Sequence, residues 1–176
     1  ENAGASELVA RTQQVLAYAW TGRCQPTALT AAFCRRFSVS TEAELLQGLA
    51  CQTFALTPDD ARLVFQVADQ GDAQAREIIA WAGRELGEMA LCVIRQVQIQ
   101  SLDFDLVLIG SLWKGGPLLA DEMRKIVLAG APRANILSFD GPPVIGAVLL
   151  GMPAQPDTLA AAVRGELMRT VRRFSP

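Results

Sequence analysis

The chain has 176 residues, 51% of them hydrophobic, which is enough for one domain with a real core and excludes a disordered polypeptide. Its formal net charge of −2 offers no basic surface to nucleic acid, and no apolar run is long enough to span a membrane. The absence of histidine excludes Ser-His triads, histidine general bases and histidine metal ligands.

Residues 1–56 are expected to form a helical subdomain, because short segments of helical periodicity alternate there with brief polar turns. Each expected helix follows a residue whose side-chain oxygen can accept a hydrogen bond from the first free backbone amides. These helices are 7–20 after Ser6, 28–37 after Thr27, and a third that starts after Ser40 or Thr41. Thr41 and Glu44 have the spacing of a capping box, which supports that third start.

Two more helices are predicted before the first strand. The stretch Thr57-Pro58-Asp59-Asp60 combines a hydroxyl cap, proline at the first helical position and acids in the first turn. Asp72 then caps the longest predicted element, residues 73–97.

The long helix 73–97 carries an apolar face that extends to Val93 and Val97. Gly83 and Gly87 lie four residues apart on one face of the same helix. Glycine in a helix interior costs on the order of 1 kcal/mol relative to alanine, so we expect a second backbone to pack closely against this face.

Residues 105–109 form a short apolar run that predicts a buried strand. Gly110 ends the strand, Gly115 and Gly116 allow a tight backbone, and Pro117 starts the next helix at its first position. A strand, a glycine-containing turn and a helix in this order are typical of ligand sites in open α/β sheets.

The remaining elements are a helix at 117–128, a second strand at 136–139, and two helices at 144–150 and 158–173. Two strands that bracket a helix predict a parallel βαβ unit. The overall expectation is therefore an α/β chain that is predominantly helical.

The four cysteines stand at 24, 34, 51 and 92, and their spacing contains no CxxC pair. This pattern indicates reduced thiols that pack in the core of a cytoplasmic protein rather than a zinc or iron–sulfur site within the chain. No catalytic residue and no metal ligand is predicted.

The segment Gly110-Ser111-Leu112-Trp113-Lys114, followed by Leu118-Leu119, closely resembles the adenosine-binding segment of the N-acetylglucosamine kinases. These enzymes belong to the BadF/BadG/BcrA/BcrD group of actin-like, sugar-kinase-fold ATPases. Three other segments resemble the same family in the same order along the chain: residues 25–30, residues 71–87 and residues 142–147.

The resemblance implies a partial C-terminal domain of the actin-like, ribonuclease H-like fold, with two short parallel strands. It divides the chain into the helical subdomain at 1–56 and a nucleotide-binding half at 57–176. In that fold an antiparallel meander would precede residue 1, so the strand at 105–109 would have an unpaired apolar edge. We expect another chain, a second copy or a shifted helix to cover that edge.

The same resemblance implies four nucleotide-binding residues. The backbone at Gly110 and Ser111 would pass the adenosine, Gly115 would lie beside the base, and Pro58 would lie on the other side of the base, where the family has a small residue. A side chain at Gly110 would block a ligand lying flat against the backbone. The Ser111 hydroxyl could hydrogen-bond the base or the ribose.

Two neighbours in the turn receive structural interpretations instead. Lys114 is expected to be solvated rather than to bind phosphate, and Trp113 is expected to anchor the turn by packing.

By resemblance, the full-length protein is an ATP- and Mg-dependent kinase of an amino sugar, N-acetylglucosamine or a relative, and a homodimer. The phosphate loops, catalytic aspartate and metal ligands of such a kinase would lie before residue 1. Two alternatives stay open: an activator ATPase of a radical dehydratase or reductase, and a truncated, non-catalytic nucleotide-binding or dimerisation module.

Overall fold

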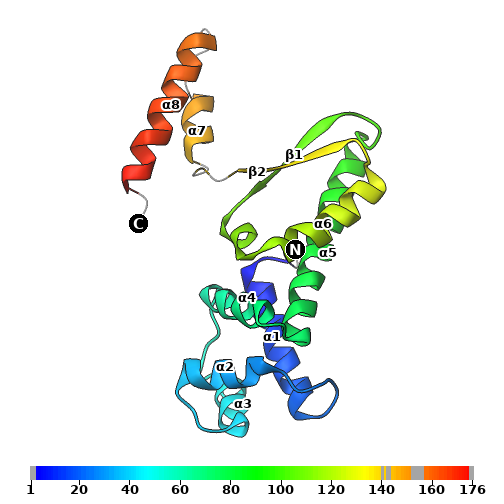
Figure 1. The fold of residues 1–176 in the computed structure, drawn as a ribbon, viewed down its shortest axis with the longest axis vertical. Coiled ribbons are helices and arrows are strands. Elements are labelled where there is room, and N and C mark those ends of the chain that lie inside the picture. The colour runs from blue at the N-terminus through cyan, green and yellow to red at the C-terminus, as the bar shows by residue number, and fades with distance from the viewer. Residues whose placement is uncertain (1–2, 140, 142–143, 152–156, 175–176) are drawn as a thin grey trace. The chain divides into compact units, whose positions relative to one another are not determined.

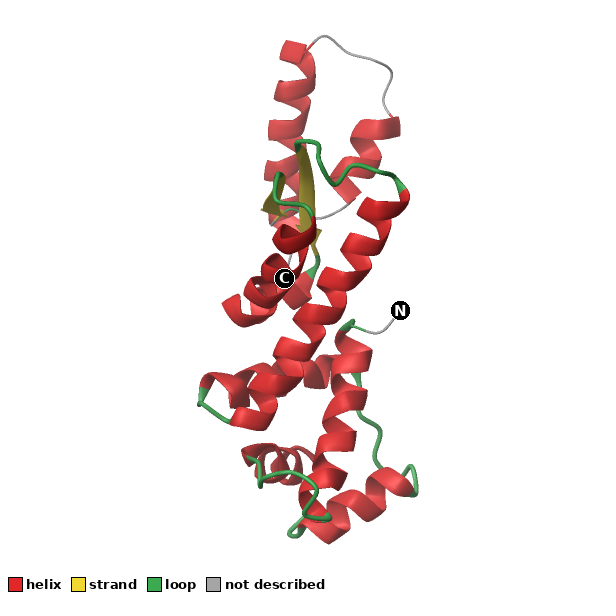
Figure 2. Cartoon of the chain, turned by 90° about the vertical axis from the view of Figure 1, so that its right-hand side faces the viewer, coloured by secondary structure: helices red, strands yellow, loops and turns green. Residues whose placement is uncertain are grey.

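A computed structural model describes residues 3–139, 141, 144–151 and 157–174. Helix dominates these residues, and two short parallel strands form one sheet (Figure 2). The chain divides into two compact units: residues 1–106 with 111–136, and residues 107–110 with 137–176.

Figure 1 labels the helices and strands in chain order. The first unit contains α1 (Ala5–Trp20), α2 (Ala28–Phe37), α3 (Glu42–Ala50), the 3₁₀ turn η1 (Pro58–Asp60), α4 (Ala61–Asp69), α5 (Ala73–Gln96), the 3₁₀ turn η2 (Ser111–Gly115) and α6 (Pro117–Gly130). Strands β1 (Phe104–Ile109) and β2 (Ala134–Phe139) pass from the first unit to the second, which also contains α7 (Val144–Gly151) and α8 (Asp157–Phe174).

Most predicted helix starts are confirmed. The Thr27 side chain caps α2, and Thr41 with Glu44 forms the expected capping box of α3. The prediction for Ser6 is wrong: α1 starts at Ala5, so Ser6 lies inside the first turn, and a cap must precede the first helical residue. Gly4 takes that place, and its carbonyl accepts the amide of Leu8 at 3.0 Å.

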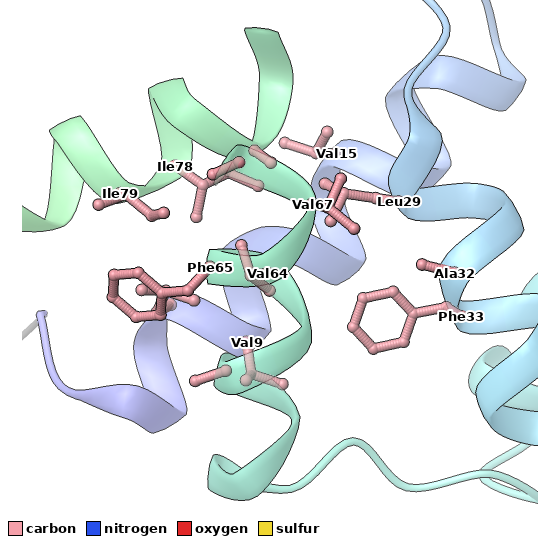
Figure 3. Close-up of a cluster of buried hydrophobic side chains, with 14 of the residues drawn as sticks. Val9, Val15, Leu29, Ala32, Phe33, Val64, Phe65, Val67, Ile78 and Ile79 are labelled. Atoms are coloured by element: carbon pink, nitrogen blue, oxygen red, sulfur yellow. The ribbon is translucent and has the colours of Figure 1, made fainter. Parts of the chain in front are cut away.

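The core of the first unit lies between α1, α2, α4 and α5 (Figure 3). Helix α4 contributes to two sides of this core: Phe65 points away from the side on which Ala32 and Phe33 of α2 lie. The largest hydrophobic side chains that are almost fully buried in this unit are Leu8, Leu16, Leu29, Phe33, Leu45, Val64, Ile78, Ile79, Leu119, Met123 and Val127. Residues before and after position 56 therefore share one core. The division of the chain at that position stays a prediction.

Asp72 joins the starts of α5 and α2, whereas the sequence predicted only its role at the start of α5. Its carboxylate accepts the Ala75 amide at 2.9 Å, which caps α5, and also the Thr27 hydroxyl at 2.8 Å. The Ala28 amide donates to the second oxygen at 2.7 Å. Burial alone would raise the pKa of Asp72, but these hydrogen bonds hold that pKa below its usual value.

Helices α5 and α6 pack side by side through the two glycines that the sequence singled out (Figure 1). A Cβ atom at Gly83 would lie 2.6 Å from the Leu119 carbonyl oxygen, and one at Gly87 would lie 2.7 Å from the Ile126 Cβ. The expected close approach of a second backbone is thus confirmed.

The predicted apolar face of α5 is wrong at its C-terminal end. Val93 and Val97 are 57% and 55% exposed, because the buried face of α5 turns instead through Gly87, Leu91 and Ile94 toward α6.

Both strands are longer than predicted, and their parallel pairing is confirmed. The prediction that residues 105–109 form a buried strand is wrong for the described residues, since Val107 is 46% and Ile109 49% exposed while Leu108 is buried. Alternate residues of a strand face opposite sides, so Val107 and Ile109 lie on the exposed face of β1 and Leu108 lies on the other face. The expected cover for the strand edge stays a prediction.

The last two helices fall within one residue of their predicted bounds. Pro142 and Pro143, which open the last family-like segment, lie outside the described residues. In the described ranges, no helix combines the length and the apolar character needed to cross a membrane.

We predict that Gly87→Ala lowers the free energy of unfolding by about 1–3 kcal/mol, because its Cβ would overlap Ile126 and force the two helices apart. Urea unfolding monitored by circular dichroism measures the change. The matched control is Gly165→Ala in α8, where a Cβ would meet nothing within 4 Å and no loss is expected. Equal stability of Gly87→Ala and wild type would contradict close packing at this position.

Candidate nucleotide site

The turn after β1 is bracketed by two glycines in the left-handed region of backbone space. Gly110 has φ +123° and Gly116 has φ +125°, values that residues other than glycine rarely adopt. Between them the predicted glycine loop forms the 3₁₀ turn η2. A Cβ at Gly110 would meet nothing within 4 Å, so backbone conformation rather than packing requires glycine there.

Gly115 is required for a different reason. A Cβ at this position would lie 2.7 Å from the Phe65 ring, so the absence of a side chain lets η2 pack directly against α4. Phe65 is buried and belongs to the core cluster. The group beside Gly115 in the structure is therefore the Phe65 ring, at a position that the family resemblance assigns to the base.

A buried carboxylate fixes the start of α4. Asp60, 5% exposed, accepts the Thr57 amide at 2.8 Å and the Thr57 hydroxyl at 3.0 Å, which closes the η1 turn around Pro58. The Arg36 guanidinium donates its Nε–H to the same carboxylate at 2.8 Å. Burial alone would raise the pKa of Asp60, but the Thr57 and Arg36 hydrogen bonds and the charge of Arg36 hold it below its usual value.

A cavity of about 530 Å³ lies between the start of α4 and η2. Its wall contains three of the four residues predicted to contact a nucleotide, namely Pro58, Ser111 and Gly115. The other lining residues are Ala5, Asp59, Ala61, Arg62, Phe65, Gln66, Asp69, Leu112 and Lys114. Gly110, the fourth predicted residue, precedes Ser111 in the chain and does not line this cavity.

The cavity wall offers both apolar and polar groups. Ala61, Phe65 and Leu112 supply apolar surface, and Arg62 and Lys114 bring positive charge. The volume falls within the roughly 300–1,000 Å³ typical of small-molecule sites. An aromatic ligand with hydrogen-bonding edges has the chemistry that such a wall would bind.

A smaller hollow of about 190 Å³ continues from the cavity along α4. It shares Phe65, Asp69 and Gly115 with the cavity and adds Arg76 and Asp121. The Asp69 carboxylate therefore borders both spaces, where it can accept a hydrogen bond from a ligand donor.

Sequence reasoning missed Phe65, Arg62 and Asp69. The available signal was their spacing, since 58, 62, 65 and 69 follow the repeat of one helix face. Trp113 packs against the core, in agreement with its expected role, whereas Lys114 is exposed and also lines the cavity.

The cysteines divide into two pairs. Cys24 and Cys34 are partly buried against the core, whereas Cys51 and Cys92 are exposed, so the prediction of core-packing thiols is wrong for the second pair. Burial raises the pKa of the Cys34 thiol, and the nearby Glu42 and Glu44 carboxylates raise it further. Over the described part of the chain, no three His, Cys, Asp or Glu side chains gather where they could hold a metal ion.

Comparison with known proteins finds no protein-family model that matches this sequence and no curated protein with a significant match.

We predict that Asp60→Asn destabilises the protein at pH 7 by about 1–3 kcal/mol, since it removes a charged acceptor of buried hydrogen bonds. Folding lowers the pKa of Asp60, so its stabilisation is complete above the unfolded value of about 4 and is lost as pH falls through the lower folded value. The difference between Asp60→Asn and wild type should therefore shrink in acid. Urea unfolding between pH 7 and pH 2.5 measures it.

The control for this prediction is Asp121→Asn, because Asp121 is exposed and makes no ion pair among the described residues. A difference between Asp60→Asn and wild type that stays constant across this pH range would contradict the role given to the Asp60 charge.

Proposed function

We propose that this chain is the adenosine-binding part of an ATP-dependent amino-sugar kinase similar to the N-acetylglucosamine kinases of the BadF/BadG/BcrA/BcrD group. The parent fold in this proposal is the actin-like, ribonuclease H-like fold. The protein acts in the cytoplasm as a homodimer, and the sugar is N-acetylglucosamine or a close relative.

The observation that supports the proposal is the meeting of Pro58 with Ser111 and Gly115 on one cavity wall. The first residue starts the η1 turn and the other two belong to η2, far along the chain. The family resemblance, which rests on sequence segments, implies that these residues surround an adenine base. Their gathering around a space of nucleoside size is what such a site requires.

In this proposal each wall has a separate task. The Phe65 ring, Ala61 and Leu112 offer apolar surface to the base, and the Ser111 hydroxyl hydrogen-bonds the base or the ribose. ATP supplies the phosphoryl group and Mg²⁺ neutralises the charge that develops on its phosphates. The residues that hold the metal, the phosphates and the sugar belong to the rest of the kinase.

The two alternatives from the sequence predict different behaviour. An activator ATPase would hold an iron–sulfur cluster between subunits and give a brown, iron-containing preparation. A non-catalytic module would bind nucleotide without turnover by any form of the protein. No feature of the described residues favours either one over the kinase.

We predict that the chain binds adenosine and ATP saturably, and that Ser111→Ala weakens adenosine binding about threefold to tenfold through loss of one hydrogen bond. Isothermal titration calorimetry measures both constants. The control is Ser138→Ala on β2, an exposed serine that lines no cavity described above and should leave binding unchanged. The full-length protein should release ADP when given N-acetylglucosamine and ATP.

Two results would contradict the proposal. One is no saturable binding of adenosine or ATP at millimolar concentration, which leaves the cavity without a nucleotide. The other is nucleotide binding without ADP release for any hexosamine, which favours the non-catalytic module.

A further inference from the structure

A second hollow, of about 500 Å³, lies where the last turn of α2 meets the start of α4. Three arginines contribute to its wall, namely Arg35, Arg36 and Arg62. The other lining residues are Ala32, Asp59, Asp60, Leu63 and Gln66. No part of the proposed kinase function uses this hollow.

One of the arginines is held in a fixed orientation. The Nε of Arg36 donates to the buried carboxylate of Asp60 at 2.8 Å, and its guanidinium lies over the Phe37 ring, 5.1 Å from the ring centroid. Its two terminal nitrogens make no hydrogen bond among the described residues, and the side chain is 47% exposed. The terminal edge of this guanidinium is therefore oriented in advance and free to donate.

The other two arginines are exposed, and within the described ranges neither pairs with a carboxylate. Both acids in the wall, Asp59 and Asp60, oppose the positive charge, although Asp60 already accepts hydrogen bonds from Arg36 and Thr57. Three guanidinium groups against two carboxylates leave a charge of +1 in the wall.

The last turn of α2 also gains from positive charge, because Arg35 and Arg36 lie next to its free carbonyl groups. That effect requires charge alone. It explains neither the buried carboxylate that orients Arg36 nor the third arginine, which comes from α4.

We propose that this hollow is a binding site for a phosphate group, either inorganic phosphate or the phosphate of a small ester. Guanidinium groups donate parallel pairs of hydrogen bonds that match the oxygens of phosphate, and a fixed guanidinium loses little freedom on binding. The site is distinct from the proposed adenosine cavity, although Asp59, Arg62 and Gln66 border both spaces.

The test follows the side-chain Nε signals of the arginines by ¹⁵N NMR while the whole chain is titrated at constant ionic strength. Inorganic phosphate and glycerol 3-phosphate are the two probes, and chloride is the reference anion. We expect saturable shifts of the Arg35, Arg36 and Arg62 signals with phosphate and none with chloride. Tighter binding of glycerol 3-phosphate than of phosphate would identify an ester as the ligand, and the reverse order would identify the free anion.

Arg35→Gln is the informative variant, because Arg35 is exposed, lines only this hollow and takes no part in holding Asp60. We expect it to weaken phosphate binding at least about tenfold, and Arg35→Lys, which keeps the charge but loses the fork, to weaken it less. Arg23→Gln is the matched control: Arg23 stacks on Tyr18, 4.0 Å from the ring centroid, and lines neither hollow.

Non-saturating shifts, or equal weakening by Arg35→Gln and Arg23→Gln, would overturn the proposal, since both results indicate general charge attraction. Thermal unfolding of each variant shows whether a loss of binding reflects a loss of fold. Adenosine separates the two proposals, because it carries no phosphate: failure of adenosine to bind while phosphate binds would reject the nucleotide site and leave this one standing.

Discussion

The hydrogen bonds of the buried Asp60 carboxylate shape both the candidate nucleotide cavity and the arginine hollow. On the N-terminal side of α4 this carboxylate accepts hydrogen bonds from the amide and the hydroxyl of Thr57. These bonds shape the turn that places Pro58 in the cavity wall. Toward α2 the carboxylate accepts the Nε–H of Arg36 and aims that guanidinium at the second hollow. One ionised group, kept charged by its donors, thus sets the geometry of two neighbouring sites.

Elements whose cause is local were predictable from the sequence, and those whose cause is tertiary were not. Caps such as Thr27 and Asp72 act within a few residues, and the close approach at Gly87 follows from a glycine that a helix would otherwise disfavour. The prediction that the apolar face of α5 extends to Val93 was wrong, because apolar spacing does not show which side of a helix packs against a partner. The prediction of a buried strand at residues 105–109 was wrong, because an apolar run does not show how many faces of a strand are covered.

The same division runs through the candidate site. The similarity of short sequence segments to the kinase family predicts Ser111 and Gly115 as site residues, and the structure places both on one cavity wall with Pro58. The residues that complete the wall, above all Phe65 against Gly115, depend on how α4 packs on η2, which no single segment encodes. The arginine hollow was missed entirely, because Arg35 and Arg62 lie on different helices and meet only through the contact of α2 with α4.

The central claim is that a purine lies in the cavity between the start of α4 and η2, against the side chains of Ala61 and Phe65. Nuclear Overhauser effects between adenosine and the isotope-labelled chain test it most directly. We expect contacts from the base protons of adenosine to the Phe65 ring and the Ala61 methyl group. Saturable adenosine binding without either contact, or the absence of binding, would contradict it.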